Sequence, residues 1–339
     1  MRVCVTGATG FLGGALTRRL LAEGVQVRAL ARPSSKADQL AVSGAAVIRG
    51  DLSDPVAIDL AVEEAEVLYH IAAMVEAPGD LADFLDANRG GTERVFQAAL
   101  QHGVRRIIYS SSIAVYGLAA ENQIIDESTP YDDQPALRDS YSQSKIQADA
   151  FAVRFARDHA ARIAVAILRP GIIFGPGKRL PFGLLGFAAG GTNVVFANPQ
   201  NRVPLNYLEN LVDAMQLAAR SATAEANASP RQYIVLDDDQ LTLAQYHQAR
   251  REIDGSRALF FSGAPVLAAA KFAEATRMVK PTGDFTARQV SRALQNRHYS
   301  SQLIRRELSW SPRVPLREAL RASLAPKSPA PPAAKPKIM

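Results

Sequence analysis

Short apolar runs alternate with amphipathic stretches along the first half of the chain. Runs of this length between turn residues are typical of strands that are buried on both faces of a sheet. They predict strands over Val3–Thr6, Val25–Leu30, Ala46–Arg49, Val67–Ile71, Arg106–Ser110 and Ala164–Leu168. The stretches between them have apolar residues at helical spacing and predict helices over Phe11–Glu23, Pro55–Glu64, Leu81–His102 and Ser140–His159. Because strands alternate with helices, we expect an α/β fold with a doubly wound parallel sheet.

The pattern changes after Arg169, where glycine and proline become frequent. A helix is predicted over Asn206–Arg220, a strand over Gln232–Leu236, and mostly helix over residues 258–324. Regular strand–helix alternation is absent there, so this part of the chain is expected to lie beside the sheet rather than to extend it throughout.

These patterns divide the chain into three parts. A Rossmann domain is expected over residues 1–170, with sheet and helix contributions from about residues 203–236. A smaller substrate-binding region is expected over residues 171–324, at the carboxyl edge of the sheet, where such folds bind ligands. The last residues, 325–339, are rich in proline, alanine and lysine and are expected to be disordered.

No apolar run reaches the roughly 18 residues that a membrane-spanning helix requires. The nearest candidate, residues 258–270, is interrupted by Gly263 and Pro265. We expect it to be a buried helix or a loop that covers the site, with contact to a membrane surface as the alternative. The N-terminal residues before the first glycine-rich turn contain no long apolar signal segment, so the expected location is the cytoplasm.

Composition narrows the possible classes of protein further. The 339 residues include 47% apolar residues and carry a net charge of +6, of which Lys327, Lys335 and Lys337 in the tail supply three. No basic stripe interleaved with aromatic residues remains, so we expect no nucleic-acid partner. Cys4 is the single cysteine and excludes an internal disulfide and a cysteine-based zinc site. The five histidines lack metal-ligand spacing, and no metal site is expected.

The first chemical motif is a glycine-rich turn between the first predicted strand and the first predicted helix. Gly7, Gly10 and Gly13 would respectively allow a tight turn, admit a pyrophosphate to the backbone, and let the helix pack closely on the strand. The helix N-terminus offers N–H donors and a positive dipole to phosphate. The motif therefore predicts a bound dinucleotide. We also assign the following residues to its binding: Thr9, Phe11, Leu12, Leu52, Ser110, Pro170 and Ile172.

The dinucleotide is predicted to be NADP, with NAD as the alternative. A carboxylate after the second strand would bind the ribose of NAD, but the sequence there is Leu-Ala-Arg-Pro-Ser-Ser-Lys, residues 30–36. Arg32 could hold a 2′-phosphate with paired donors, or it could be a solvated cation near the adenine. Asp51, after the third strand, is expected at the adenine edge, or it caps the next helix, a role that Ser53 or Asp54 suits better.

The second motif is a tyrosine and a lysine one helical turn apart, Tyr141 and Lys145. Because a tyrosine has a pKa near 10, it needs a neighbouring cation to act as a general base at neutral pH. Tyr141 is therefore predicted to exchange a proton with a substrate hydroxyl while hydride moves to or from the nicotinamide. Ser112, at the end of a predicted strand, is expected to bind the substrate oxygen, with Ser111 as the second candidate.

These motifs, in this order and spacing, resemble those of the extended short-chain dehydrogenase/reductases, the NAD-dependent epimerase/dehydratase superfamily. The resemblance runs from TGATGFLG through GDL, HIAA, SSIAVYG, YSQSK and LRPGIIFGPG to LSWSPRVPLREAL. It implies a catalytic triad of Ser112, Tyr141 and Lys145, with the backbone of Ala72 and Ala73 lining the cofactor. It further implies that Asn88 ties its helix to the active-site strands or is purely structural, and that the chain forms a homodimer through helices.

Two chemistries within that family remain open. The sequence looks most similar to the branch of 3β-hydroxysteroid dehydrogenases and dihydroflavonol reductases, which interconvert a secondary alcohol and a ketone in a small-molecule substrate. Sugar-nucleotide epimerases or dehydratases are the alternative. Against them, Ile172 stands where they usually have asparagine, and no late Arg-Pro-Gly-Asp segment is present. Phosphate ligands could still come from four basic residues: Lys178, Arg179, Arg202 and Arg231. A third reading, a dinucleotide-sensing module without catalysis, conflicts with the intact triad.

Overall fold

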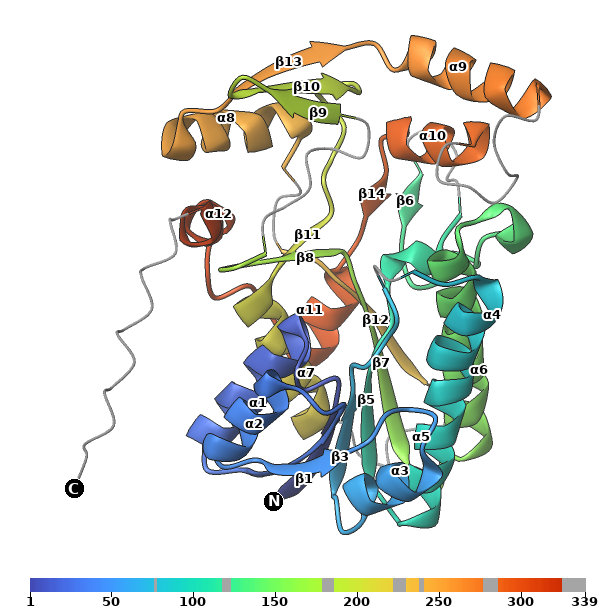
Figure 1. The fold of residues 1–339 in the computed structure, drawn as a ribbon, viewed down its shortest axis with the longest axis vertical. Helices are drawn as coiled ribbons and strands as arrows, with labels where there is room; N and C mark the ends of the chain where they lie inside the picture. The colour runs from blue at the N-terminus through green and yellow to red at the C-terminus, as the bar shows by residue number, and fades with distance from the viewer. Residues whose placement is uncertain are drawn as a thin grey trace.

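A seven-stranded parallel sheet forms the centre of the computed structural model, which describes residues 1–75, 78–117, 123–178, 186–221, 230–237, 241–276 and 286–324 (Figure 1). In spatial order its strands are β12 (Arg231–Val235), β7 (Ala164–Pro170), β5 (Arg106–Ser110), β4 (Val67–His70), β1 (Arg2–Thr6), β2 (Gln26–Ala31) and β3 (Ala46–Arg49). The chain order reverses between β1 and β4, and ligands of such sheets bind at this switch point, beyond the carboxyl ends of the strands. The expected α/β doubly wound fold is confirmed.

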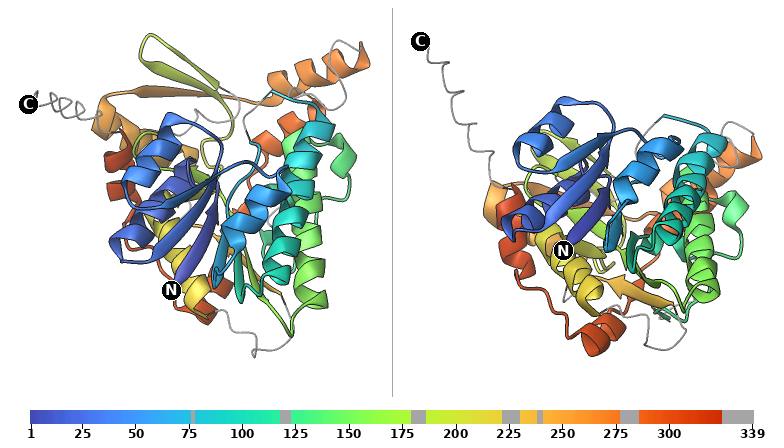
Figure 2. Two further views of the ribbon diagram at one scale, coloured as in Figure 1. Left: turned by 60° about the horizontal axis from the view of Figure 1, so that its bottom comes forward. Right: turned by 90° about the horizontal axis from the view of Figure 1, so that it is seen from below.

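Helices cover both faces of this sheet (Figure 2). One face packs against α1 (Phe11–Ala22), α2 (Ser35–Val42), α7 (Leu208–Ser221) and α11 (Gln302–Leu308). The other face packs against α3 (Pro55–Val62), α5 (Gly91–Gln101) and α6 (Ser140–Asp158). Cys4 lies in β1, between β4 and β2, and is fully buried between these layers. Burial on both faces explains why the strands are continuous apolar runs rather than alternating ones.

The helix predicted over Leu81–His102 is interrupted by a π-helical segment. It consists of α4 (Leu81–Phe84), the π-helix η1 (Leu85–Gly90) and α5. A wider turn of this kind is rare and frequently lies at a functional site. Here it brings Asn88 into the protein interior, where it is 2% exposed.

The remaining elements lie above the carboxyl ends of the strands (Figure 1). Three small sheets form there: β8 with β11, β6 with β14, and β9, β10 and β13 together. Their bounds are β6 Ile124–Ile125, β8 Ile172–Phe174, β9 Gly186–Ala189, β10 Thr192–Phe196, β11 Leu205–Tyr207, β13 Arg257–Phe261 and β14 His298–Tyr299. Four helices accompany them: α8 Leu243–Asp254, α9 Ala264–Ala275, α10 Ala287–Leu294 and α12 Leu316–Leu324.

The structure corrects several sequence predictions in this region. The helix predicted to begin at Asn206 begins at Leu208, because the preceding residues pair in β11. Residues 258–261 form strand rather than helix, since they pair with β10. The segment expected to be buried is largely exposed: Phe261 is 50% exposed, and only Ala270 of α9 is buried. No described helix is both long and apolar enough to cross a membrane. The predicted disordered tail lies outside the described residues.

Candidate active site

A continuous cavity of about 1730 Å³ runs along the carboxyl edge of the sheet. The glycine-rich turn and the ends of β2 and β3 line one part of it, and Arg292, Ala293, Gln295, Arg297 and Tyr299 line another. Typical pockets for small ligands occupy roughly 300–1,000 Å³, so this cavity has room for a dinucleotide and a second molecule. The predicted site residues that line it are Gly7, Thr9, Gly10, Phe11, Leu12, Gly13, Arg32, Asp51, Leu52, Ala72, Ala73, Ser110, Ser111, Ser112, Tyr141, Lys145 and Ile172.

Close backbone packing explains the glycines of the turn. Gly7 has a φ of +73°, and a Cβ there would lie 2.8 Å from the amide nitrogen of Ala72. A Cβ on Gly13 would lie 2.2 Å from the carbonyl oxygen of Gly7. Gly10 is the N-cap of α1 and provides no side-chain hydrogen bond. The first N–H groups of α1 therefore remain available to a phosphate at the cavity wall.

Arg32 follows β2 and Asp51 follows β3, and both line the cavity. Two hydrogen bonds from Ser53 to Asp51, from its hydroxyl at 2.6 Å and its amide at 2.8 Å, lower the pKa of the carboxyl, and Arg32 lowers it further. Asp54, not Asp51, caps α3. Ser34 caps α2, whereas Arg32 lines the cavity.

Tyr141 and Lys145 lie on α6. Asp139 caps the N-terminus of this helix, because its side chain accepts from the Ser142 amide. The Lys145 ammonium is buried and donates to the Ser110 carbonyl at 2.9 Å and to the Tyr109 hydroxyl at 3.2 Å. Burial lowers the pKa of Lys145 to about 8, although Asp149 opposes the shift. A cationic amine and a tyrosine thus share one face of the helix at the cavity wall.

The structure distinguishes the two candidate serines. The Ser111 hydroxyl is buried and donates to the Asp149 carboxylate. Both serines line the cavity, and the Ser112 oxygen accepts from the Ala114 amide at 3.0 Å. A hydroxyl that accepts one bond still has its own proton to donate. Ser112 can therefore donate to a substrate oxygen, whereas the proton of Ser111 is already used.

A chain of buried neutral groups connects Lys145 with the glycine-rich turn. The Tyr109 hydroxyl bonds Lys145 and Thr92, and His70 bonds Thr92 through Nε2 at 3.0 Å and Thr6 through Nδ1 at 2.8 Å. Because the Thr92 hydroxyl donates to a carbonyl, it accepts from Nε2, which therefore carries the proton. Burial, reinforced by Lys145, lowers the pKa of His70 to about 3. His70 is therefore neutral and holds one tautomer.

Asn88 connects the π-helix to both sides of the site. Its Oδ1 accepts from the Met74 amide at 2.7 Å, and its Nδ2 donates to the Met74 carbonyl at 2.9 Å and to the Ser144 hydroxyl at 2.8 Å. The segment after β4, which lines the cavity, is thus fixed to α6 beside Tyr141. These bonds reach α6 and the segment after β4 rather than the strands themselves, and the role of Asn88 stays a prediction.

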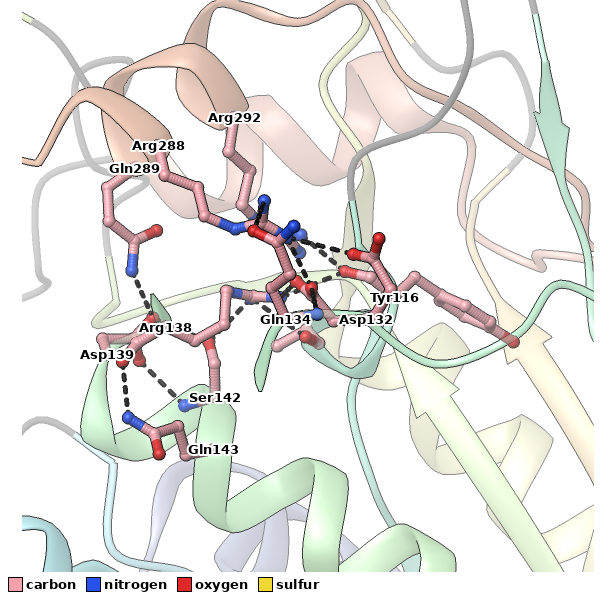
Figure 3. Close-up of polar contacts among 12 residues, drawn as sticks. Tyr116, Asp132, Gln134, Arg138, Asp139, Ser142, Gln143, Arg288, Gln289 and Arg292 are labelled. Carbon is pink, nitrogen blue, oxygen red and sulfur yellow. Dashed lines mark hydrogen bonds and ion pairs between the residues drawn. The ribbon is translucent and has the colours of Figure 1, made fainter. Parts of the chain in front are cut away.

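Arg138 is a positioning residue that the sequence did not identify. It is 1% exposed and donates to the carbonyls of Ala114 at 3.0 Å and Tyr116 at 3.2 Å, to the Ser142 hydroxyl at 2.8 Å and to Asp132 at 2.6 Å (Figure 3). It therefore joins the loop after Ser112 to the first turn of α6. Its position directly before the cap of that helix was the available signal.

Some predicted residues lie away from the cavity. Pro170 is buried in β7 and does not line the cavity, because the strand continues two residues beyond its predicted end. Of the basic residues considered as phosphate ligands, Lys178 and Arg202 line the cavity, whereas Arg231 donates to the Ser221 carbonyl. Arg179 lies outside the described residues.

The chain is similar to several characterised groups of proteins. Residues 3–235 match the family model described as "NAD dependent epimerase/dehydratase family". The chain belongs to this family. A 2-alkyl-3-oxoalkanoate reductase of Stenotrophomonas maltophilia is 32% identical over 72% of this chain and 73% of its own length. A 3 beta-hydroxysteroid dehydrogenase/Delta 5-->4-isomerase of Mycobacterium tuberculosis is 29% identical over 76% of this chain and 70% of its own.

Two solved structures resemble this chain over nearly its whole length. The crystal structure of gox2253 covers 95% of this chain and 96% of its own, with a TM-score of 0.78 and 27% identity. The structure of MoeE5 with UDP-glucose and NAD covers 95% and 97%, with a TM-score of 0.69 and 21% identity, and shows shared fold alone. As a member of the family with reductases and dehydrogenases as relatives, the chain is an NAD(P)-dependent oxidoreductase. The glycine turn and the uncapped start of α1 fit the pyrophosphate of such a cofactor.

Proposed function

We propose that this protein interconverts a secondary alcohol and a ketone by hydride transfer, with Tyr141 as general acid and base. The observation that carries the proposal is that Tyr141, Lys145 and Ser112 line one cavity with the glycine-rich turn. The relatives named as reductases and dehydrogenases support this type of reaction. The nicotinamide, when bound, supplies or accepts the hydride.

Each residue of the triad then has one task. Tyr141 gives its proton to the substrate oxygen during reduction and takes it back during oxidation. Lowering the pKa of a tyrosine by about three units requires roughly 4 kcal/mol, which the buried ammonium of Lys145 helps to supply. Ser112 donates to the same substrate oxygen and stabilises the negative charge that develops on it.

The proposed cofactor is NADP rather than NAD. Support comes from Arg32, which lines the cavity after β2, where the sequence has no carboxylate to bind a ribose hydroxyl. A guanidinium is suited to hold a phosphate with two parallel hydrogen bonds. The neighbouring Asp51 carboxylate accepts two hydrogen bonds from Ser53.

Epimerisation of a sugar nucleotide is the second candidate. Lys178 and Arg202 favour it, because both line the cavity and could bind phosphate. Ile172 opposes it, because it also lines the cavity and offers no hydrogen bond to a diphosphate. We therefore favour a ketone in a more apolar substrate.

Mass spectrometry of the dinucleotide released from freshly purified, undialysed protein tests the two candidates. An epimerase regenerates its cofactor in every turnover, whereas a reductase must exchange it. We expect an empty site or readily exchanged NADP, followed by oxidation of NADPH in the presence of ketones. Near-stoichiometric bound NAD would overturn the reductase assignment. Full activity in Tyr141→Phe would overturn the proposed general acid.

A further inference from the structure

The end of the cavity opposite the glycine-rich turn is strongly basic. Arg202, Arg292 and Arg297 line it. Three acidic residues line the cavity among the described residues. Asp86 pairs with Arg94 at 3.0 Å, and Asp51 lies beside Arg32. Asp139, the third, caps α6 and accepts from Gln289 at 3.2 Å (Figure 3). The three arginines therefore face the cavity without a carboxylate of their own.

Arg292 extends from α10 into a cluster of like charges. Its guanidinium donates to the Tyr116 carbonyl, the same oxygen that accepts from Arg138 (Figure 3). Burial, together with Arg297 and Arg138, lowers the pKa of Arg292 to about 9. The nearest acid on this side, Asp132, is already shared by Arg138 and Arg288, each at 2.6 Å. No ion pair in the described part of the chain includes Arg292.

Arg297 has a buried donor without a partner. Its guanidinium lies 5.7 Å from the ring centre of Tyr299, which orients it. Its Nη1 is shielded from solvent and has no hydrogen-bond partner among the described residues. A buried donor of a charged group is costly to leave unsatisfied. An anionic oxygen from a ligand in the cavity would satisfy it and would relieve the repulsion from Arg292.

We propose that Arg292 and Arg297 bind a carboxylate carried by the substrate close to its reacting carbon. The proposal rests on the proposed function and specifies its substrate class as hydroxy acids and oxo acids. Arg292 and Ser112 line the same cavity, and the Tyr116 carbonyl that accepts from Arg292 lies four residues after Ser112 in the chain. Two planar guanidinium groups match the paired oxygens of a carboxylate.

A matched pair of substrates tests the proposal. The full chain oxidises 3-hydroxyoctanoate and its methyl ester with NADP, or with NAD if that is the cofactor found, and kcat/KM is compared. We expect the acid to be favoured at least tenfold, since a charge-assisted hydrogen bond discriminates by about that factor or more. Arg297→Met should bring the ratio near one, and Arg297→Lys should give an intermediate ratio. Arg251→Met, an equal loss of charge at an exposed position of α8, should leave the ratio unchanged.

Calorimetric titration with octanoate in the presence of cofactor provides a readout that does not depend on turnover. We expect binding at least tenfold weaker in Arg297→Met and unchanged in Arg251→Met. Equal kcat/KM for acid and ester in the unmodified protein would overturn the carboxylate site and leave the reductase assignment intact. Octanoate binding that depends on Arg297, without oxidation of either compound, would support the site and refute the proposed function. Arg297-dependent binding of UDP-glucose without octanoate binding would overturn the carboxylate.

Discussion

Replacing Lys145 by methionine should make the protein more stable at neutral pH while abolishing its activity. Burial lowers the pKa of this lysine from 10.5 to about 8, which corresponds to a cost of roughly 3.4 kcal/mol for keeping it charged. The variant also loses the bonds to Ser110 and Tyr109, each contributing about 1 kcal/mol. We therefore expect a net gain of about 1 kcal/mol in the free energy of unfolding at pH 7.

The sign of the effect should reverse at high pH. The unfolded chain binds the proton more tightly than the folded chain, so the destabilisation is complete below pH 8 and disappears as the pH rises to about 10.5. At pH 10.5 only the lost hydrogen bonds remain, and the variant should be less stable by about 2 kcal/mol.

Urea unfolding followed by circular dichroism from pH 7 to 10.5 measures this difference directly. Comparison of the two proteins at each pH cancels the other titrating groups, and Lys271→Met, at an exposed position of α9, should show a flat difference. A flat difference for Lys145→Met would refute the reasoning, because it would mean that the ammonium is not disfavoured in the folded protein.

Four other substitutions follow from the geometry of the site. Gly13→Ala should weaken dinucleotide binding at least tenfold in a fluorescence titration, because its Cβ would lie 2.2 Å from a backbone oxygen. Arg32→Asp should shift the ratio of kcat/KM for NADPH over NADH by tenfold or more towards NADH. Tyr141→Phe should lower kcat by about 10²–10⁴ with an unchanged Kd for the dinucleotide. Arg138→Met should cost about 3 kcal/mol in urea unfolding, because it breaks a fully buried ion pair; a loss below 1 kcal/mol would contradict its anchoring role.

The sheet and the glycine-rich turn were predictable because each depends on residues close together in sequence. An apolar run bounded by turns predicts a strand such as β1. The spacing of Gly7, Gly10 and Gly13 follows from the close packing of the turn against the first residues of α1. Tyr141 and Lys145 are one helical turn apart, so their common face also follows from local geometry. These features were confirmed as structure, while their catalytic roles stay predictions.

The basic end of the cavity was not predictable from local pattern. Arg292 and Tyr116 are 176 residues apart, and only the folded chain shows that both lie beside Arg138. The strand β13 was mistaken for helix because its identity depends on pairing with β10. The interruption at Asn88 was missed because this residue bonds Met74 and Ser144, and contacts so distant in sequence are not visible in a local pattern.

Because Cys4 is buried in the sheet, its reaction with a thiol reagent can be used to measure local unfolding of the sheet. The thiol lies in the middle of β1, which is paired on both sides, and burial raises its pKa to about 12. Thiol reagents react with the thiolate, so labelling requires the sheet to separate first. The rate of labelling of the unmodified chain therefore gives the free energy of that opening, and its slowing with added dinucleotide gives an affinity without any enzymatic assay.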